Sequence, residues 1–235
     1  MIYNGVSDLL VRITTDRRPR PSTLVDFGLA SSSSPTVWSS EITYRRGTEI
    51  CGEKEPAEYV YRVKEGAVRS YKLLSDGRRQ IGAFHLTGDI FGSTSEICHR
   101  FTAEAVTDAT LWLVRRQSLE ERSRTDGSLA RELLSMTTRN LQHAEDHMLL
   151  LGRKDALEKV ATFLIEMDER LAAAGVMTLP MSRHDIADYL GLTLETVSRA
   201  LSRLRRSGVL SFAGNSQREI TILDRTQLLS LDLQG

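Results

Sequence analysis

Four residues near one end of a short amphipathic stretch could read nucleic-acid bases: Leu194, Glu195, Ser198 and Arg199. Arginine can donate two hydrogen bonds to guanine, glutamate can accept from the cytosine amino group, and an aliphatic side chain can touch a thymine methyl group. At about 100° per residue, Glu195 and Arg199 fall on one side of a helix and Leu194 and Ser198 at its flank. The opposite side is apolar and consists of Val197, Ala200, Leu201 and Leu204. The pattern predicts a helix that packs with one face and contacts DNA with the other.

A second interpretation of this helix is purely structural. Glu195 could complement the helix dipole, and Arg199 could pair with it one turn later on a solvated face. The surrounding charge favours DNA, because residues 194–208 carry four arginines against Glu195 alone. Polar and basic residues that could contact phosphates are Ser182, Arg183, Thr193, Thr196, Ser202, Arg203 and Arg206.

The residues before the candidate reading helix predict a second helix and a tight turn. Ser182 can cap a helix, with Asp185 three residues on as the short form of a capping box. Its apolar side is Ile186, Ala187 and Leu190, and Gly191 ends it. Leu192 can fill the angle between the helices, and Thr193 can cap the second one. The segment from Ser182 to Leu210 therefore predicts a helix-turn-helix.

The composition is that of an ordinary globular protein with room for two modest domains. The chain has 235 residues, of which 40% are hydrophobic and 26% charged, and its formal net charge is zero. A neutral total does not exclude DNA, because exposed charges are screened beyond about 10 Å and phosphate attraction is local. The sequence contains no apolar run of about 20 residues and no secretory signal pattern, so we expect a cytoplasmic protein without a membrane span.

Metal sites are not expected. The two cysteines, Cys51 and Cys98, form no CxxC motif and cannot hold zinc or a four-cysteine cluster. Both are expected to be free, partly buried thiols, with a redox role as the alternative. His85 and His99 lack the His-x-His pattern followed by Glu that a cupin metal site would need.

We expect an N-terminal arm over residues 1–36 and a β-rich domain over residues 37–125. The arm is mostly extended, although its pattern permits a helix around Val6 to Ile13. Many short strands with Gly-centred turns then favour an antiparallel barrel or jelly roll. The predicted strands are Glu41–Tyr44, Tyr59–Lys64, Ala67–Leu73, Arg79–His85 and Ala109–Val114.

After a short helix at Ser118 to Arg124, residues 126–152 predict a long dimerisation helix that ends in a bend at Gly152. Alternating spacings of four and three are typical of a coiled-coil seam. The seam consists of Ala130, Leu134, Thr137, Leu141, Ala144, Met148 and Leu151. We expect it to contact a second copy, because a helix-turn-helix usually reads a two-fold site. The alternative is that the stripe packs on its own barrel.

Residues 153–235 predict a winged helix-turn-helix domain. A helix at Lys154 to Ala174 would supply a second core, and strands at Val209–Phe212 and Glu219–Leu223 would form the wing. Its tip, Ser216 to Arg218, could touch phosphates, although such residues are more often solvated. The expected fold class is α+β, with the barrel first and the helix-turn-helix last.

Two motifs make this domain order resemble a known family. They are GDIFG at Gly88 to Gly92 and LETVSRALSRLRRSGVL at Leu194 to Leu210. Together they resemble the Crp/Fnr family of bacterial transcription regulators, and Glu195, Ser198 and Arg199 match the E-x-x-S-R motif of its Fnr and FixK branches. The sequence looks most similar to FixK-type regulators.

The resemblance implies a cyclic-nucleotide-binding-like barrel and a homodimer that recruits RNA polymerase to double-stranded DNA. It also implies a TTG-N8-CAA palindrome and genes for low-oxygen respiration or nitrogen fixation. Within that site, Arg199 would take the guanine, Glu195 a cytosine or a neighbouring base, and Leu194 a thymine methyl group. Ser198 would assist at the flank.

Departures from the family pattern predict a regulator without a cofactor. Cyclic-AMP-binding members have an acidic residue soon after GDxxG and an Arg-Ser pair, whereas here Ser93 follows Gly92 and Phe101 follows Arg100. The N-terminal cysteines of Fnr-type oxygen sensors are also missing. One alternative is a barrel that holds a small molecule or haem. Another is a cupin-like enzyme with a DNA-binding tail, but we expect no enzyme activity.

Overall fold

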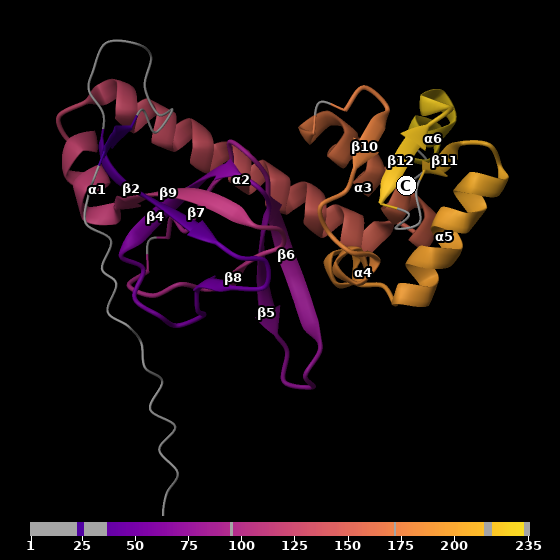
Figure 1. The fold of residues 1–235 in the computed structure, drawn as a ribbon, viewed down its shortest axis with the longest axis horizontal. Helices are drawn as coiled ribbons and strands as arrows, with labels where there is room; N and C mark the ends of the chain where they lie inside the picture. Colours follow the sequence, from indigo (N-terminus) through magenta and orange to yellow (C-terminus); the bar gives the residue numbers. More distant parts are fainter. Residues whose placement is uncertain (1–22, 26–36, 95, 172, 214–217, 233–235) are drawn as a thin grey trace, which may run out of the picture.

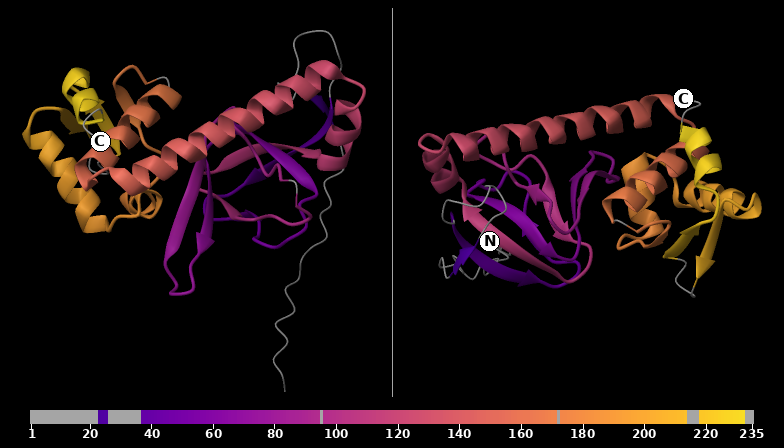
Figure 2. Two further views of the ribbon diagram at one scale, coloured as in Figure 1. Left: turned by 180° about the vertical axis from the view of Figure 1, so that it is seen from behind. Right: turned by 90° about the horizontal axis from the view of Figure 1, so that it is seen from above.

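The computed structural model describes residues 23–25, 37–94, 96–171, 173–213 and 218–232. Within them, a β-rich part is followed by the long helix α2, which lies along the barrel and leads into a C-terminal part rich in helices (Figures 1 and 2). The predicted α+β architecture is confirmed. The segment Val6 to Ile13 and the wing-tip residues Ser216 and Gln217 lie outside the described residues.

Two antiparallel sheets form the β-rich part among the described residues. One has the order β1-β2-β9-β4-β7, and the other has the order β3-β8-β5-β6. Their bounds are β1 Thr23–Val25, β2 Val37–Tyr44, β3 Glu49–Cys51, β4 Tyr59–Glu65, β5 Val68–Leu73, β6 Arg79–His85, β7 Ile90–Phe91, β8 Thr102–Ala105 and β9 Ala109–Arg115.

The predicted long strands correspond to β2, β4, β5, β6 and β9, with small shifts at their ends. The prediction missed β3, β7 and β8, which have two to four residues each. It also missed β1, which lies within the expected arm and pairs with the start of β2. Such short strands are too brief to show an alternating pattern and are held by their neighbours in the sheet.

Two helices connect the barrel to the C-terminal part: α1, Arg116–Ser123, and α2, Gly127–Arg153. The Asp126 side chain caps α2 by accepting hydrogen bonds from the backbone N–H groups of Ser128 and Leu129. The bend predicted at Gly152 is wrong by two residues, because α2 continues through Gly152 and the extended conformation begins at Lys154. A single exposed glycine weakens a helix by only about 1 kcal/mol relative to alanine, so it need not end one.

The C-terminal part contains four helices and three strands among the described residues. Their bounds are α3 Ala156–Arg170, β10 Val176–Thr178, α4 Arg183–Leu190, α5 Leu194–Arg206, β11 Leu210–Ala213, β12 Glu219–Ile222 and α6 Arg225–Asp232. The helix predicted from Lys154 to Ala174 is shorter, because a capping box at Asp155 and Glu158 starts it and Leu171 caps its end. Neither β10 nor α6 was predicted.

One apolar core joins the two parts of the chain. Ile81, Phe84 and Leu86 of the barrel belong to the same buried cluster as Phe163 of α3 and Tyr189 of α4. The Phe84 ring lies 5.2 Å from that of Tyr189 and 6.4 Å from that of Phe163, measured between centroids. The helix-turn-helix is therefore packed directly against the barrel of its own chain.

Candidate nucleic-acid interface

The first helix of the pair, α4, begins at the predicted capping box. The Asp185 backbone N–H donates to Ser182 Oγ at 3.2 Å, and the Ser182 backbone N–H donates to Asp185 Oδ2 at 3.0 Å. These bonds satisfy two of the backbone donors that a helix start leaves without partners. The predicted apolar side, Ile186, Ala187 and Leu190, is buried.

The turn between the helices requires a glycine. Gly191 adopts φ +62°, a left-handed conformation, and its N–H donates to the Ala187 carbonyl. Leu192 packs against the core, as predicted for a residue that fills the angle between the helices. Thr193 then caps α5, since its hydroxyl accepts from the Thr196 backbone N–H at 3.2 Å.

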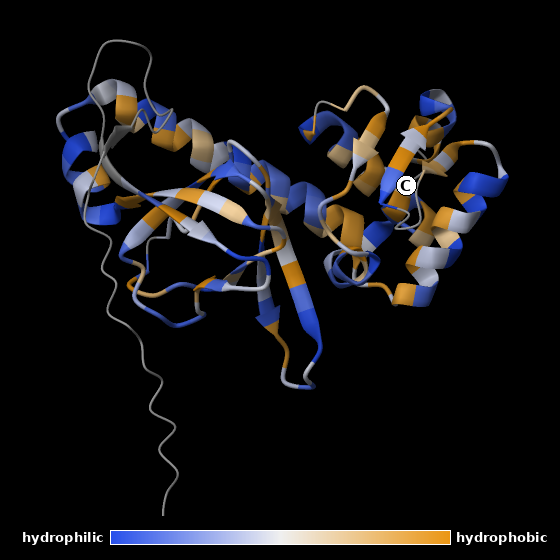
Figure 3. Ribbon diagram, viewed as in Figure 1, coloured by the Kyte–Doolittle hydropathy of each residue, from blue (hydrophilic) through white to orange (hydrophobic). Residues whose placement is uncertain are grey.

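Helix α5 has one buried face and one open face, as its sequence predicts. Val197, Ala200, Leu201 and Leu204 are at most 7% exposed. Leu194 is 41% exposed, Glu195 and Arg199 are exposed, and Ser198 is partly buried. The helix lies at the outer edge of the C-terminal part, with its start next to the turn from α4 and a hydrophilic far end (Figure 3). The four candidate base-reading residues thus lie together at its accessible N-terminal end.

Glu195 is held as a hydrogen-bond acceptor. Its own backbone N–H and the Thr193 hydroxyl donate to the carboxylate, and together with the charge of Arg199 they lower its pKa. Arg199 donates weakly to Thr196 Oγ1, at 3.4 Å. In the part of the chain that the structure describes, both side chains have only local partners, so they could turn toward a base without breaking a buried contact.

The candidate phosphate-contacting residues fall into three groups. Ser202, Arg203 and Arg206 are exposed along α5. Ser182 and Thr193 instead use their hydroxyl groups as helix caps. The Arg183 guanidinium lies 5.7 Å from the centroid of the Phe212 ring, and Arg218 donates to the Pro180 carbonyl at 3.5 Å. The exposed residues of α5 are therefore the readiest to contact phosphates.

The predicted seam on α2 is open to solvent in the single chain. Leu134 is 67% exposed, Leu141 58% and Met148 65%. Thr137 and Ala144 are also exposed, whereas Ala130 and Leu151 are partly buried. A different stripe of α2, made of Leu129, Met136 and Leu150, is buried. The alternative that the seam packs on its own barrel is therefore wrong.

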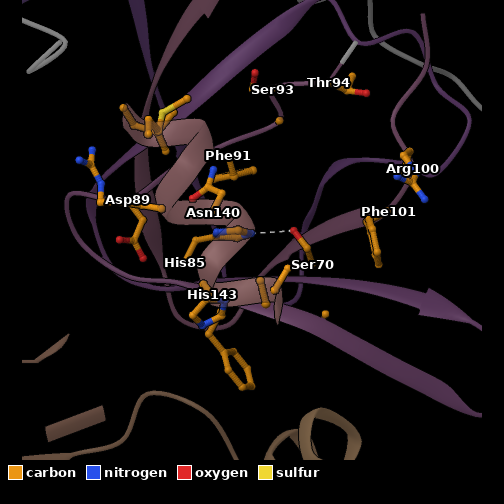
Figure 4. A pocket seen from close by; sticks show the side chains of 18 of the residues that line it. Ser70, His85, Asp89, Phe91, Ser93, Thr94, Arg100, Phe101, Asn140 and His143 are labelled. Atoms are coloured by element: carbon orange, nitrogen blue, oxygen red, sulfur yellow. Dashed lines mark hydrogen bonds between the residues drawn. The ribbon is translucent and has the colours of Figure 1, made fainter. Parts of the chain in front are cut away.

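A pocket of about 930 Å³ lies between the barrel and α2. Figure 4 shows His85, Phe91, Ser93 and Phe101 from the barrel and His143 from α2 around it. His85 is hydrogen-bonded to Ser70 Oγ at 2.8 Å and stacks on Phe91, with 4.6 Å between ring centroids. The sequence did not predict that α2 would line a pocket, because the periodicity of a helix does not show which loop of the barrel lies opposite it.

The GDIFG motif forms part of the pocket wall. Gly92 adopts φ +82°, and a Cβ there would lie 2.7 Å from Cδ2 of Tyr61. Phe101 lies over Gly82, where an added Cβ would approach its Cε1 atom to 3.1 Å. The phenyl ring therefore lines the pocket beside β6.

Acidification is expected to destabilise the protein through His85. Burial lowers the pKa of its imidazole from 6.5 to about 4. A histidine whose folded pKa is lowered contributes stability above its ordinary pKa and loses it as the pH falls toward the folded value. Between pH 6.5 and 4 the loss should be about 1–3 kcal/mol, and His85→Gln should show a shallower pH dependence in thermal unfolding. His184→Gln, at a side chain that is 68% exposed, is the control. Equal slopes for the two variants would contradict the expectation.

The two cysteines are free, as predicted. Cys51 is buried, and burial raises the pKa of its thiol to about 12. Because the thiolate is the reactive form, Cys51 is poorly suited to redox chemistry at neutral pH. Cys98 is partly exposed, so the redox alternative now depends on this residue.

Two further observations concern the described part of the chain alone. It contains no group of three or more His, Cys, Asp or Glu side chains that could hold a metal ion. None of its helices combines the length and the apolar character needed to cross a membrane.

Comparisons with known proteins agree with this domain order. Residues 41–126 match the cyclic nucleotide-binding domain, and residues 158–231 match the Crp-like helix-turn-helix domain. The nitrogen fixation regulation protein FixK of Rhizobium meliloti is 40% identical over 91% of this chain and 96% of its own length. FixK of Azorhizobium caulinodans is 41% identical over 99% of this chain and 91% of its own.

A solved structure, that of FixK2 from Bradyrhizobium japonicum, has the same fold. It is 61% identical in sequence, and the two superpose with a TM-score of 0.80 over 84% of this chain and 98% of that one. The relatives are transcription regulators, which agrees with the expectation that this chain is not an enzyme.

Proposed function

The chain belongs to the Crp/Fnr family of transcription regulators, in its FixK-type branch, and we propose that it is a homodimeric activator that reads a TTG-N8-CAA palindrome. The observation that carries the proposal is the open N-terminal end of α5, where Leu194, Glu195 and Arg199 are exposed on a helix whose opposite face is buried. The names of its FixK relatives support a role in the regulation of nitrogen fixation, and control of microaerobic genes is part of the same proposal.

Each base-reading residue has a role that its chemistry allows. Arg199 donates two hydrogen bonds to the guanine, and Glu195 accepts from a cytosine amino group. Leu194 contacts a thymine methyl group, and Ser198 assists at the flank. The residues that contact phosphates in this proposal are Ser202, Arg203 and Arg206 along α5, together with Ser182, Arg183, Thr193 and Thr196.

Dimerisation through the α2 seam supplies the two-fold symmetry that a palindrome requires. The exposed apolar side chains of Leu134, Leu141 and Met148 support this, because a second copy would remove them from water. Two recognition helices one helical turn of DNA apart, about 34 Å, would then contact the two half-sites.

The activator is expected to work without a cyclic nucleotide or an iron–sulfur cluster. Ser93 stands where the ribose contact of cyclic-AMP-binding members is acidic, and Phe101 stands where they have a serine. Two cysteines in the chain are fewer than the four that such clusters take. Its partners would be double-stranded DNA, RNA polymerase and a second copy, in the cytoplasm.

Titration with short duplexes tests the proposal. The protein should bind a TTG-N8-CAA duplex about 10³-fold or more tightly than a scrambled duplex at physiological salt, as specific DNA-binding proteins do. Fluorescence anisotropy at two salt concentrations would separate specific from phosphate binding. Equal affinity for the two duplexes would exclude sequence-specific reading.

The pocket supports one alternative, a regulator gated by a small molecule or haem. Its volume of about 930 Å³ falls in the range of ligand-binding pockets. A visible absorption band in the purified protein, or a rise in melting temperature with cyclic nucleotides, would favour this alternative.

A further inference from the structure

A cluster of ion pairs connects one hairpin of the barrel to the first helix of the helix-turn-helix. Arg79 of β6 donates from Nη2 to Asp185 Oδ1 at 2.7 Å and from Nε to Asp188 Oδ2 at 2.8 Å. Arg69 of β5 donates from Nη1 to the same Oδ1 atom of Asp185, also at 2.7 Å. Arg69 and Asp185 are 116 residues apart in the chain, so this contact exists only in the folded protein.

The cluster is largely withdrawn from solvent. The Arg69 side chain is 15% exposed, Arg79 19%, Asp185 7% and Asp188 15%. Removing one member of a buried ion pair is costly, because it leaves the other charge without a partner. Loss of one member of this cluster should therefore cost more than loss of a partner in an exposed surface pair.

The same helix is also held at its other end. The Tyr189 carbonyl accepts a hydrogen bond from His147 of α2 at 3.0 Å, and the two rings stack with 4.1 Å between centroids. Gln80 of β6 donates to the same carbonyl at 3.3 Å. The barrel and α2 thus fix both the first and the last turn of α4.

The orientation of α5 depends on that of α4. The turn between them runs only from Gly191 to Thr193, and Ile186 and Leu190 of α4 share a buried core with Val197 and Leu201 of α5. Packed helices of this kind move together, because interiors are close-packed. A rotation of α4 on the barrel would therefore also move the open end of α5.

We propose that Arg79 and Arg69 are positioning residues for DNA reading: from the barrel, they hold α4 and the reading end of α5 in one orientation relative to the dimer helix α2. The inference rests on the proposed function. A two-fold site tolerates little error in the spacing of its reading helices, since each must meet its half-site at about 34 Å from the other. The arginines set this spacing without touching DNA.

A charge reversal with a neighbouring control tests the proposal. Arg79→Glu should weaken binding to the TTG-N8-CAA duplex about tenfold, as remote coupling residues do. Arg78→Glu is the matched control, because Arg78 is 79% exposed and, among the residues that the structure describes, pairs only with Asp76 in its own turn. It should stay within about twofold of the wild type. Adding Asp188→Arg to Arg79→Glu restores one ion pair and should recover part of the affinity, although the carboxylate introduced at position 79 still faces Asp185.

Spacing preference separates positioning from simple loss of stability. The wild type should prefer N8 over N7 and N9 spacers, and Arg79→Glu should flatten this preference while its affinity for a single half-site stays unchanged. A variant that is only less stable would lose affinity for all these duplexes alike. If Arg79→Glu does not fold, the neutral Arg79→Gln takes its place in the same titrations.

Amide hydrogen exchange in the absence of DNA tests the positioning role of Arg79 even if the proposed function is wrong. If the wild type shows no preference for the palindrome, the proposed function is wrong. The positioning role then predicts that Arg79→Glu, and not Arg78→Glu, raises exchange in α4 and α5 at least fivefold. Wild-type exchange together with wild-type spacing preference in Arg79→Glu would overturn the inference.

Discussion

Arg199→Ala is expected to abolish the preference for guanine in the TTG half-site. Arg199 is exposed at the open end of α5, and the only hydrogen bond of its side chain among the described residues is a weak one to Thr196. A lost bidentate contact to guanine costs about 1–3 kcal/mol, or roughly 5- to 150-fold in affinity. Because the residue is exposed, the melting temperature should hardly change.

Titration with three duplexes measures this effect: the palindrome, the palindrome with its guanines replaced, and a scrambled sequence. Arg206→Ala is the control, since Arg206 is an exposed arginine on the same helix but at its far end. It should weaken binding to all three duplexes alike and reduce the slope of log affinity against log salt concentration by about one. If Arg199→Ala behaves as Arg206→Ala does, Arg199 is a phosphate contact and the base-reading assignment is wrong.

Leu141→Glu is expected to produce a monomer with little affinity for the palindrome. Leu141 is 58% exposed in the single chain and lies at the centre of the seam between Leu134 and Met148. A buried carboxylate facing its copy across a two-fold axis would be repelled and desolvated. Without the second reading helix, affinity for the full palindrome should fall by about 10²-fold or more.

Sedimentation velocity and duplex titration measure the two consequences separately. Gln142→Glu is the control, because it adds the same charge to the next residue, which is exposed but off the seam. It should remain a dimer and bind as the wild type does. A dimeric Leu141→Glu variant with normal affinity would show that α2 does not use this seam.

Local features of the interface could be predicted from sequence because they depend on neighbouring residues. The caps at Ser182 and Thr193, the turn at Gly191 and the buried face of α5 are all where the pattern indicates. The caps and the turn depend on contacts within about four residues, and the apolar side of α5 repeats with the helical period, so all of them can be recognised in a short stretch of sequence. Periodicity also marked the α2 seam, but only the structure shows that the seam is exposed and that Leu129, Met136 and Leu150 are buried instead.

Elements that depend on distant partners were missed. Strand β10 has three residues and exists because β12 pairs with it. Helix α6 was not expected, and it is held against α3 by Arg225, which pairs with Asp168 and Glu169. Neither segment has a strong pattern of its own, so tertiary contacts decide its structure.

Sequence by itself determined the domain order, the helix-turn-helix and the candidate base-reading residues. Helical periodicity, capping residues and turn glycines can each be recognised within a short stretch of sequence. Only the tertiary structure showed that Asp185 does more than cap α4. It also receives Arg69 and Arg79 from the barrel, more than a hundred residues earlier. Such a contact cannot be recognised in the local sequence, because each arginine has the pattern of an ordinary surface residue on its strand. Only in the folded protein does a buried carboxylate lie beside both side chains.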